Sequence, residues 1–452
     1  MKIRIFPSDK GDCLLITGKD GKRILADGGM EVSYSASVAP ALGALAKAKK
    51  KLDVVYVSHI DDDHIAGILQ LMDDLVAWRI FDHKVKQGLS PKAPAAARPP
   101  EVLNLWHNGF RDTVDDNEGA IEDQLAANAT ILSGFTSRNP QLNRAVAAHQ
   151  DLAESVAQAV KLNKRIADGI LGIPHNAPAN GKLMMVGSKK TVIDIGGMTV
   201  RVLGPFKADL ETLRGEWNDW FEKSQSTIGK IRKEAKSQED DLASGASFVA
   251  PLKAEATALA QALAMGVDDD LDDALAKKLG KKSAVTTPNI ASLTLLVEEA
   301  GKTILLTGDA HADEVLKGLA HHGLLDANGG IHVNVLKVQH HGSEHNMTDA
   351  FAKAVTADHY VFCGNGFSTN PEPVVIQRLY DARLGPADQR SPNGVKKGFT
   401  FWFNSTSKLA PSDRRAHMKL VEALMDKLEA AGNGKLKVRW PEDLEGSQDF
   451  TP

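Results

Sequence analysis

The sequence predicts an α/β fold in which short strands alternate with helices over 452 residues. Apolar runs rich in β-branched and aromatic residues, which favour buried strands, recur in both halves of the chain. Segments with apolar residues three or four positions apart, which favour helices, separate several of these runs. Polar and acidic residues follow several strands directly. This order favours a layered core whose functional groups lie in the loops after the strands.

The first hundred residues predict a hairpin, two further strands and two helices. Gly11-Asp12 is the expected turn of the hairpin, and the proline-rich residues 90–100 are expected to form a surface loop. The expected elements are strands over residues 2–6 and 13–17, a strand ending at Asp27-Gly28-Gly29, a helix over residues 38–49, a strand over residues 52–57 and a helix over residues 65–76.

The rest of the chain adds strands and a late helix. Gly196-Gly197 and Gly301-Lys302 are the expected turns of two more hairpins. The expected elements are strands over residues 192–195, 198–203, 288–297, 303–307, 333–338 and 399–403, and a helix from Ser412 to Ala431.

Composition places the chain among soluble globular proteins, with 42% hydrophobic and 25% charged residues. The net charge of −4 argues against bulk attraction to nucleic acid or anionic membranes, although a local basic groove remains compatible with it. No run approaches the roughly 18–20 apolar residues that span a bilayer, so no membrane partner is expected. Two cysteines and no signal peptide favour a reducing cytoplasm.

Residues 54–67 carry the most specific pattern. The buried strand expected at Val54–Val57 is followed within six residues by four potential metal ligands: His59, Asp61, Asp63 and His64. Such charges beside an apolar strand are costly unless something neutralises them, and a divalent cation does this most simply. The alternative is an acidic turn with two incidental histidines.

Two later strands end in the same way. Residues 303–307 lead into Gly308-Asp309, and residues 333–338 lead into Gln339-His340-His341-Gly342-Ser343. An unpaired carboxylate at the tip of a buried strand is costly, so Asp309 is a further candidate ligand. A sandwich core can bring all three loops to one edge.

The H-x-D-x-D-H pattern of residues 59–64 resembles the H-x-H-x-D-H signature of the metallo-β-lactamase superfamily, with Asp61 in place of the second histidine. This variant looks like the hydrolase domain of the ComEC-type competence proteins and their free-standing relatives. The resemblance implies a four-layer αββα metallo-β-lactamase sandwich over residues 1–405, with helical insertions at about 110–190 and 207–283. Residues 406–452 would form a C-terminal helix and tail.

The resemblance also implies a ligand set with one or two divalent ions, zinc or manganese, with magnesium as a further option. One ion is expected on Asp63, His64, His340 and Asp309, and a weaker one on His59, Asp61 and Asp309. Gly204-Pro205 stands where many members supply a third histidine. His341 is an alternative ligand. Asp63 and Asp309 are the expected catalytic residues, and the residues expected to contact substrate or support the ligands are His341, Ser343, Asn370 and Asp27.

Three functions remain open on the sequence. The first is a phosphodiesterase or nuclease that cleaves DNA through a metal-bound hydroxide, as the resemblance implies. The second is a hydrolase of small molecules such as lactones, thioesters or cyclic nucleotides. The third is a binding protein with a degenerate site, which the retained ligand motifs disfavour. Basic candidates for phosphate contact, otherwise plain surface residues, are Lys337, Arg390, Lys396 and Lys397.

Residues 207–283 are the least family-like part of the chain. Their charged helical patterns favour a solvated surface insertion. A second hypothesis is a lid that keeps the enzyme latent until a regulatory protein moves it or a protease cleaves it near residues 243–250.

Overall fold

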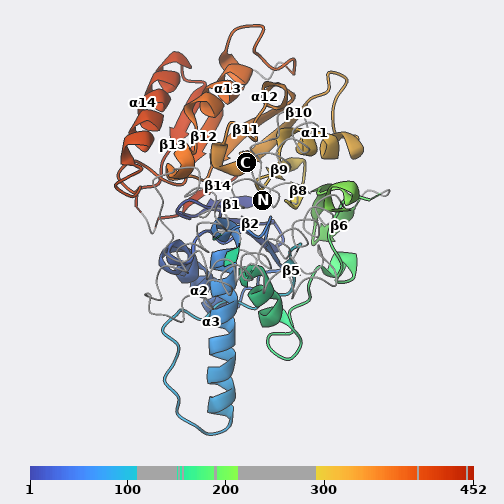
Figure 1. Cartoon of the computed structure of the whole chain (residues 1–452), viewed down its shortest axis with the longest axis vertical. Coiled ribbons are helices and arrows are strands. Elements are labelled where there is room, and N and C mark those ends of the chain that lie inside the picture. Colours follow the sequence, from blue (N-terminus) through green and yellow to red (C-terminus); the bar gives the residue numbers. More distant parts are fainter. Residues whose placement is uncertain are drawn as a thin grey trace, which may run out of the picture.

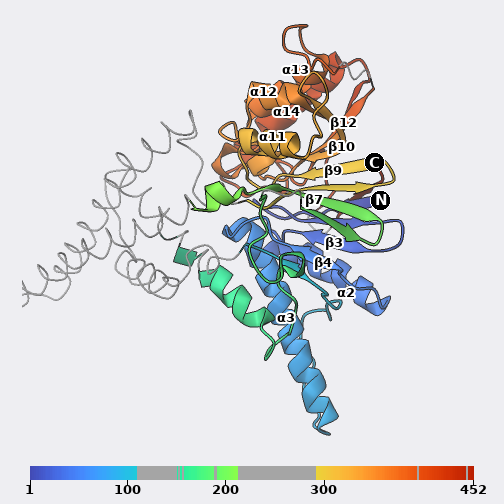
Figure 2. The ribbon, with the colours of Figure 1, turned by 90° about the vertical axis from the view of Figure 1, so that its right-hand side faces the viewer.

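The computed structural model describes residues 1–108, 150, 153–154, 157–187, 191–211, 292–393, 397–443 and 446–452. Two β-sheets face each other, and helices cover the outer face of each (Figures 1 and 2). This is the four-layer αββα arrangement, so the predicted fold class is confirmed. The predicted insertion at 207–283 lies outside the described residues from residue 212 onwards. The predicted insertion at 110–190 lies outside them over residues 110–149, 151–152, 155–156 and 188–190.

The first sheet has six strands and joins an antiparallel hairpin to a parallel half. Strands β1, β2 and β3 are antiparallel neighbours, whereas β3, β4 and β5 run parallel. In spatial order the strands are β14 (Gln448–Phe450), β1 (Lys2–Ile5), β2 (Leu14–Thr17), β3 (Arg23–Ala26), β4 (Val54–Tyr56) and β5 (Leu105–Trp106).

The second sheet has eight strands and is also mixed. Strands β9 to β13 run parallel, and the hairpins β6–β7 and β8–β9 are antiparallel. In spatial order the strands are β13 (Leu436–Arg439), β12 (Phe399–Phe403), β11 (Val355–Phe362), β10 (Ile331–Lys337), β9 (Lys302–Leu306), β8 (Thr294–Glu299), β7 (Met198–Gly204) and β6 (Val192–Ile195).

Helices pack on the two outer faces. The first sheet is covered by α1 (Glu31–Ser33), a π-helical turn (Tyr34–Val38), α2 (Ala39–Lys47) and α3 (Asp62–Lys86). The second sheet is covered by α11 (Ala312–His321), α12 (Asp349–Ala354), α13 (Pro373–Leu384) and α14 (Arg415–Ala431). Short 3-10 turns are η3 (Ala177–Ala179), η4 (Gln339–Gly342) and η5 (Phe367–Thr369). None of the described helices is long and apolar enough to cross a membrane.

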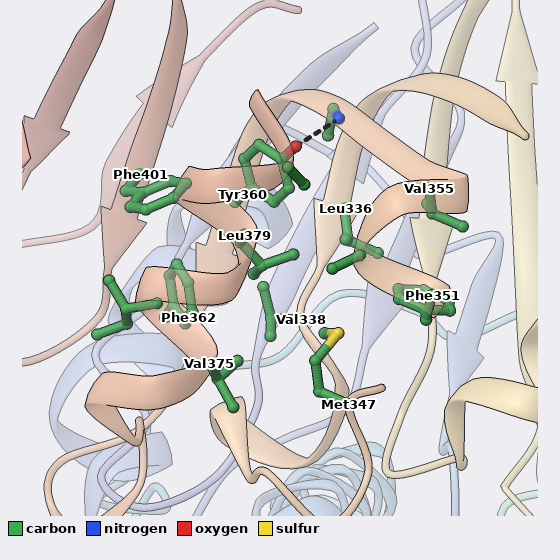
Figure 3. Packing of buried hydrophobic residues seen from close by; sticks show 14 of the residues in the cluster. Leu336, Val338, Met347, Phe351, Val355, Tyr360, Phe362, Val375, Leu379 and Phe401 are labelled. Carbon is green, nitrogen blue, oxygen red and sulfur yellow. Dashed lines mark hydrogen bonds between the residues drawn. The ribbon is translucent and has the colours of Figure 1, made fainter. Parts of the chain in front are cut away.

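Three apolar layers hold these parts together, because successive residues of a strand face opposite sides of its sheet. Along β10, Val335 packs between the two sheets, whereas Leu336 packs under the helices. Figure 3 shows the helix-side layer, where Leu336, Phe362 and Leu379 meet. The layer between the sheets is the one that fixes how the ligand loops of one sheet face those of the other.

Two segments differ from their predictions. Helix α3 begins at Asp62 and runs for 25 residues, well beyond the predicted end at residue 76. Its distal half extends away from the sandwich (Figure 1), and the Trp78 indole there donates to the Ala96 carbonyl while Arg98 stacks on the ring. These contacts with the loop that directly follows the helix stabilise turns that local periodicity did not predict.

The predicted C-terminal tail contributes a strand to each sheet. Strand β13 pairs parallel with β12, and β14 pairs antiparallel with β1. Arg4 of β1 forms a bidentate ion pair with Asp449 of β14. Strands β13 and β14 are therefore edge strands of the two sheets rather than parts of a tail that trails from the domain.

A glycine contact seats the first turn of α3 against the end of β3. The Gly28 amide donates to the His64 carbonyl and the Gly67 amide donates to the Gly29 carbonyl, each at 2.9 Å. A β-carbon on Gly67 would lie 2.1 Å from the Gly28 carbonyl oxygen. Only glycine permits this approach, which places the residues after β3 beside Asp63 and His64.

We expect Gly67→Ala to lower the free energy of unfolding by about 1–3 kcal/mol, because the added methyl forces the backbones apart. It should also weaken metal binding, since the same shift displaces His64. Urea denaturation and metal titration measure the two effects. Gly169→Ala is the matched control, because a β-carbon there meets no atom within 4 Å. A Gly67→Ala protein with unchanged stability would contradict this account.

Candidate metal centre

The loops that follow the strands of both sheets meet at one edge of the sandwich. The first sheet supplies Asp12 from the β1–β2 loop, Asp27 from the end of β3, and residues 59–64, which span the β4–α3 loop and the first turn of α3. The second sheet supplies Asp309 after β9 and the residues after β10. Because β3 and β4 run parallel, as do β9 and β10, their carboxyl ends carry these groups to the same place.

Four histidines converge on the carboxylate of Asp309. The Nε2 atom of His64 lies 3.3 Å from Asp309 Oδ1. The Nε2 atoms of the other three lie 3.6 Å from Asp309 Oδ2, and these are His59, His340 and His341. Asp309 itself is buried. Its two oxygens are therefore the geometric centre of the site.

The opposite nitrogen of each histidine is already engaged. The Nδ1 contacts are His64 with Asp27 Oδ2 at 3.1 Å, His341 with Asp12 Oδ1 at 3.1 Å, His340 with Asn346 Oδ1 at 2.7 Å and His59 with Ser58 Oγ at 3.1 Å. Such outer contacts fix the ring orientation of a metal-ligating histidine and leave Nε2 free for the ion. In the described part of the chain, the buried Nε2 atoms of His59, His64 and His341 and the Oδ1 atom of Asp309 make no hydrogen bond.

The remaining carboxylates divide the centre into two groups. Asp61 Oδ2 lies 3.4 Å from His59 Nε2, which forms one group with Asp309. Asp63 Oδ2 lies 3.1 Å from His341 Nε2, and Asp63 Oδ1 lies 3.9 Å from His64 Nε2, which forms the other. Buried imidazole and carboxylate atoms without hydrogen-bond partners are costly unless a cation satisfies them. The donor set therefore fits divalent metal ions, with Asp309 shared between the groups.

The sequence-predicted residues occupy different positions in this centre. His340 retains 27% exposure of its side chain and approaches Asp309 from the solvent side, whereas His341 is buried and contacts both Asp63 and Asp12. The structure thus places the alternative ligand, His341, in the group of Asp63 and His64.

The predicted supporting residues lie around this centre. Asp27 binds His64, and Asn370 Nδ2 donates to the His340 carbonyl at 3.4 Å. Ser343 is buried and its amide donates to the same carbonyl at 2.9 Å, so its contact is with the backbone of the loop. Asp62 accepts from Gln158, and no contact joins it to the histidines within the described residues.

Sequence reasoning missed the roles of two residues. The sequence predicts Asp12 in the turn of the first hairpin and assigns it no contact with a ligand, yet its carboxylate orients His341. Lys337 is buried and forms an ion pair with Asp12, so its interpretation as a surface residue was wrong. The signal was its register, because Lys337 is two positions from Val335 and shares its inward face. Arg390 and Lys397 are exposed as predicted, and Lys396 lies outside the described residues.

Burial and the charges of neighbouring residues shift the pKa values of the histidines and carboxylates in the centre. Burial lowers the pKa of His341, but Asp309 and Asp12 outweigh it and raise the pKa to about 10. The pKa of His64 is likewise raised, because Asp309, Asp27 and Asp12 outweigh its burial. Burial favours the neutral form of Asp309, yet the histidines around it, His64 first, hold its pKa well below the usual range.

Comparison with known proteins supports this assignment over part of the chain. A family model described as the metallo-beta-lactamase superfamily matches residues 8–77. This segment contains Asp12, Asp27 and the four potential ligands of residues 59–64. No curated protein matches the chain significantly. The match and the buried aspartate–histidine cluster together indicate a metal-dependent hydrolase. Asp309, Lys337 and His341 lie beyond the matched segment, so their assignment rests on geometry.

We expect metal binding to release protons and the apparent affinity to rise with pH. With a pKa of about 10, His341 is protonated at neutral pH, and a cation must displace that proton. Affinity should therefore increase as pH approaches 10 and fall towards acid. Isothermal titration calorimetry with Zn²⁺ or Mn²⁺, in buffers of different ionisation enthalpy, counts the protons.

The matched variants are His341→Asn, which should reduce the proton release, and His332→Asn, which should not. His332 lies outside the centre and binds Thr356 and Asp358. A metal affinity that stays constant between about pH 6 and pH 9, with no proton release, would refute the assignment of a protonated His341 in the metal-free protein.

Proposed function

We propose that this chain is a metal-dependent phosphodiesterase whose preferred substrate is DNA. The observation that carries the proposal is the convergence of four histidine Nε2 atoms on the Asp309 carboxylate. The Nδ1 atom of each of these histidines contacts a second side chain that fixes the orientation of the ring. A carboxylate placed between two groups of ligands suits a pair of cations, and paired cations suit in-line displacement at phosphorus.

The donor chemistry supports the same class of reaction. Asp61, Asp63 and Asp309 add carboxylate oxygens to the imidazole nitrogens, so the centre is harder than an all-histidine zinc site. Harder donors favour manganese or magnesium beside zinc. Bound ions of this kind supply positive charge for the phosphate oxygens and an activated water.

The exposure of the ligands indicates where a substrate would enter. Asp61 and His340 retain 30% and 27% side-chain exposure, and Asp63 retains 17%, whereas His59, His64 and Asp309 are at most 2% exposed. The open side of the centre is therefore bordered by Asp61, Asp63 and His340. In this proposal Asp63 would accept a proton from the attacking water, and Asp309 would hold the two ligand groups at a fixed spacing.

The choice of DNA rests on the resemblance of the ligand motifs to ComEC-type hydrolases. The replacement of a histidine by Asp61 and the His340-His341-Gly342-Ser343 loop carry that resemblance. The net charge of −4 adds no general attraction to nucleic acid, so contacts near the centre would have to supply it.

The test combines metal content with hydrolysis. We expect the purified protein to hold zinc or manganese and, with Mn²⁺, to cleave linear and circular DNA and bis(p-nitrophenyl) phosphate. Asp63→Ala and His64→Ala should abolish cleavage, and Asp309→Asn should lower the turnover at least about 100-fold, since it removes the shared ligand. Asp388→Asn, a change at an exposed residue of the α13–β12 connection, is the control and should leave turnover intact.

Two outcomes would contradict the proposal. Metal-loaded protein that cleaves a lactone or thioester but no phosphodiester would replace it with a small-molecule hydrolase. Purified protein that takes up neither zinc nor manganese would remove the catalytic account altogether.

A further inference from the structure

Lys337 is a buried cation inside the metal centre. It is the last residue of β10, and its side chain is 2% exposed. The ammonium forms an ion pair with Asp12 Oδ2, donates to the Gly308 carbonyl at 3.3 Å and lies 3.8 Å from Asp309 Oδ1. A buried lysine loses its hydration, so it stays charged only where fixed negative charge compensates the ammonium.

The lysine acts on the ligands through Asp12. One oxygen of Asp12 faces Lys337, and the other lies 3.1 Å from His341 Nδ1. The opposite nitrogen of His341 lies 3.1 Å from Asp63. The resulting series of contacts runs from Lys337 through Asp12 to His341 and Asp63, and each of its three steps joins the two sheets.

Asp12 is also close enough to ligate a metal itself. Ligand atoms of Asp12, His64, Asp309 and His341 all lie within 4.8 Å of one another. The Lys337 ammonium contacts two members of that group, Asp12 and Asp309. Lys337 therefore brings a fixed positive charge to the two carboxylates of this group.

The net charge of the centre also indicates a role for the Lys337 ammonium. Five carboxylates surround the histidines, namely Asp12, Asp27, Asp61, Asp63 and Asp309. Two divalent ions balance four of them, and one ammonium balances the fifth. Lys337 therefore completes the neutrality of a two-metal centre with neutral histidines.

We propose that Lys337 is a fixed internal cation of the metal centre, a positioning residue that holds Asp12 against His341 and keeps this carboxylate from ligating a metal. The inference rests on the proposed metal-dependent function, but it concerns metal binding and not the substrate. Asp12 orients the ring of His341, and Lys337 orients Asp12.

The experiment is a double-mutant cycle on metal affinity and coordination. The variants are Lys337→Met, Asp12→Asn and the double variant. Lys353→Met is the control, because the Lys353 ammonium donates to the Asp388 carbonyl of the α13–β12 connection. Chelator competition measures the Kd for Zn²⁺, and Co²⁺ absorption reports the ligand set. Thermal unfolding without metal separates a loss of folding from a change at the centre.

Asp12→Asn should weaken metal binding most, because it leaves an unpaired ammonium beside the ions and removes the partner of His341. The double variant should recover at least about tenfold of that loss, since no unpaired charge remains. Lys337→Met should change the Co²⁺ spectrum, because Asp12 becomes free to bind. Lys353→Met should match the unmodified protein in both measurements.

A double variant that binds no better than Asp12→Asn would overturn the proposal, as would a Lys337→Met protein with the original spectrum and Kd. If Lys337→Met does not fold, the comparison of Asp12→Asn with the double variant still decides the question. Metal binding that follows this pattern without DNA cleavage would refute the proposed function and leave this inference standing.

Discussion

The structure depends on one electrostatic constraint, the burial of the carboxylates of Asp12, Asp27 and Asp309 around a cluster of histidines. Such a group cannot stay ionised in a protein interior unless cations, protons or hydrogen bonds compensate it. Three arrangements follow from that requirement. Each histidine turns Nε2 inwards, each Nδ1 has an outer partner, and Lys337 lies buried beside Asp12. The ligand atoms are thereby preorganised for cation binding.

Neither sheet holds the centre alone. The first sheet contributes the loop after β4 together with Asp12 and Asp27, and the second contributes Asp309 and the residues after β10. The apolar layer between the sheets sets their separation, and residues such as Tyr56 and Val335 fill it. Close packing makes this layer stiff, so the ligand loops keep their spacing to within the tolerance that metal coordination demands. The stability of the sandwich and the precision of the centre have the same physical source.

The loop after β10 illustrates why neighbouring residues have different roles. Both His340 and His341 have positive φ angles, 43° and 56°, which non-glycine residues rarely adopt. Two successive left-handed residues reverse the usual alternation of side chains, so His341 enters the buried group while His340 stays at the solvent edge. Strain of this kind persists only where surrounding contacts impose it, and here the Asn346 amide holds both Asp309 and His340. Local sequence carries no signal for that geometry.

The sequence by itself determined the fold class, most strands and the residues that could ligate a metal, because strand propensity, turn residues and ligand spacing are local properties. It predicted β12 to the residue and placed His59, Asp61, Asp63 and His64 within six residues shortly after a strand. Tertiary structure alone decided that β13 and β14 close the two sheets and that α3 continues past residue 76. It also decided that Asp12 and Lys337 join the centre. Pairing, burial and charge compensation join residues far apart in the chain, and no single segment contains that information.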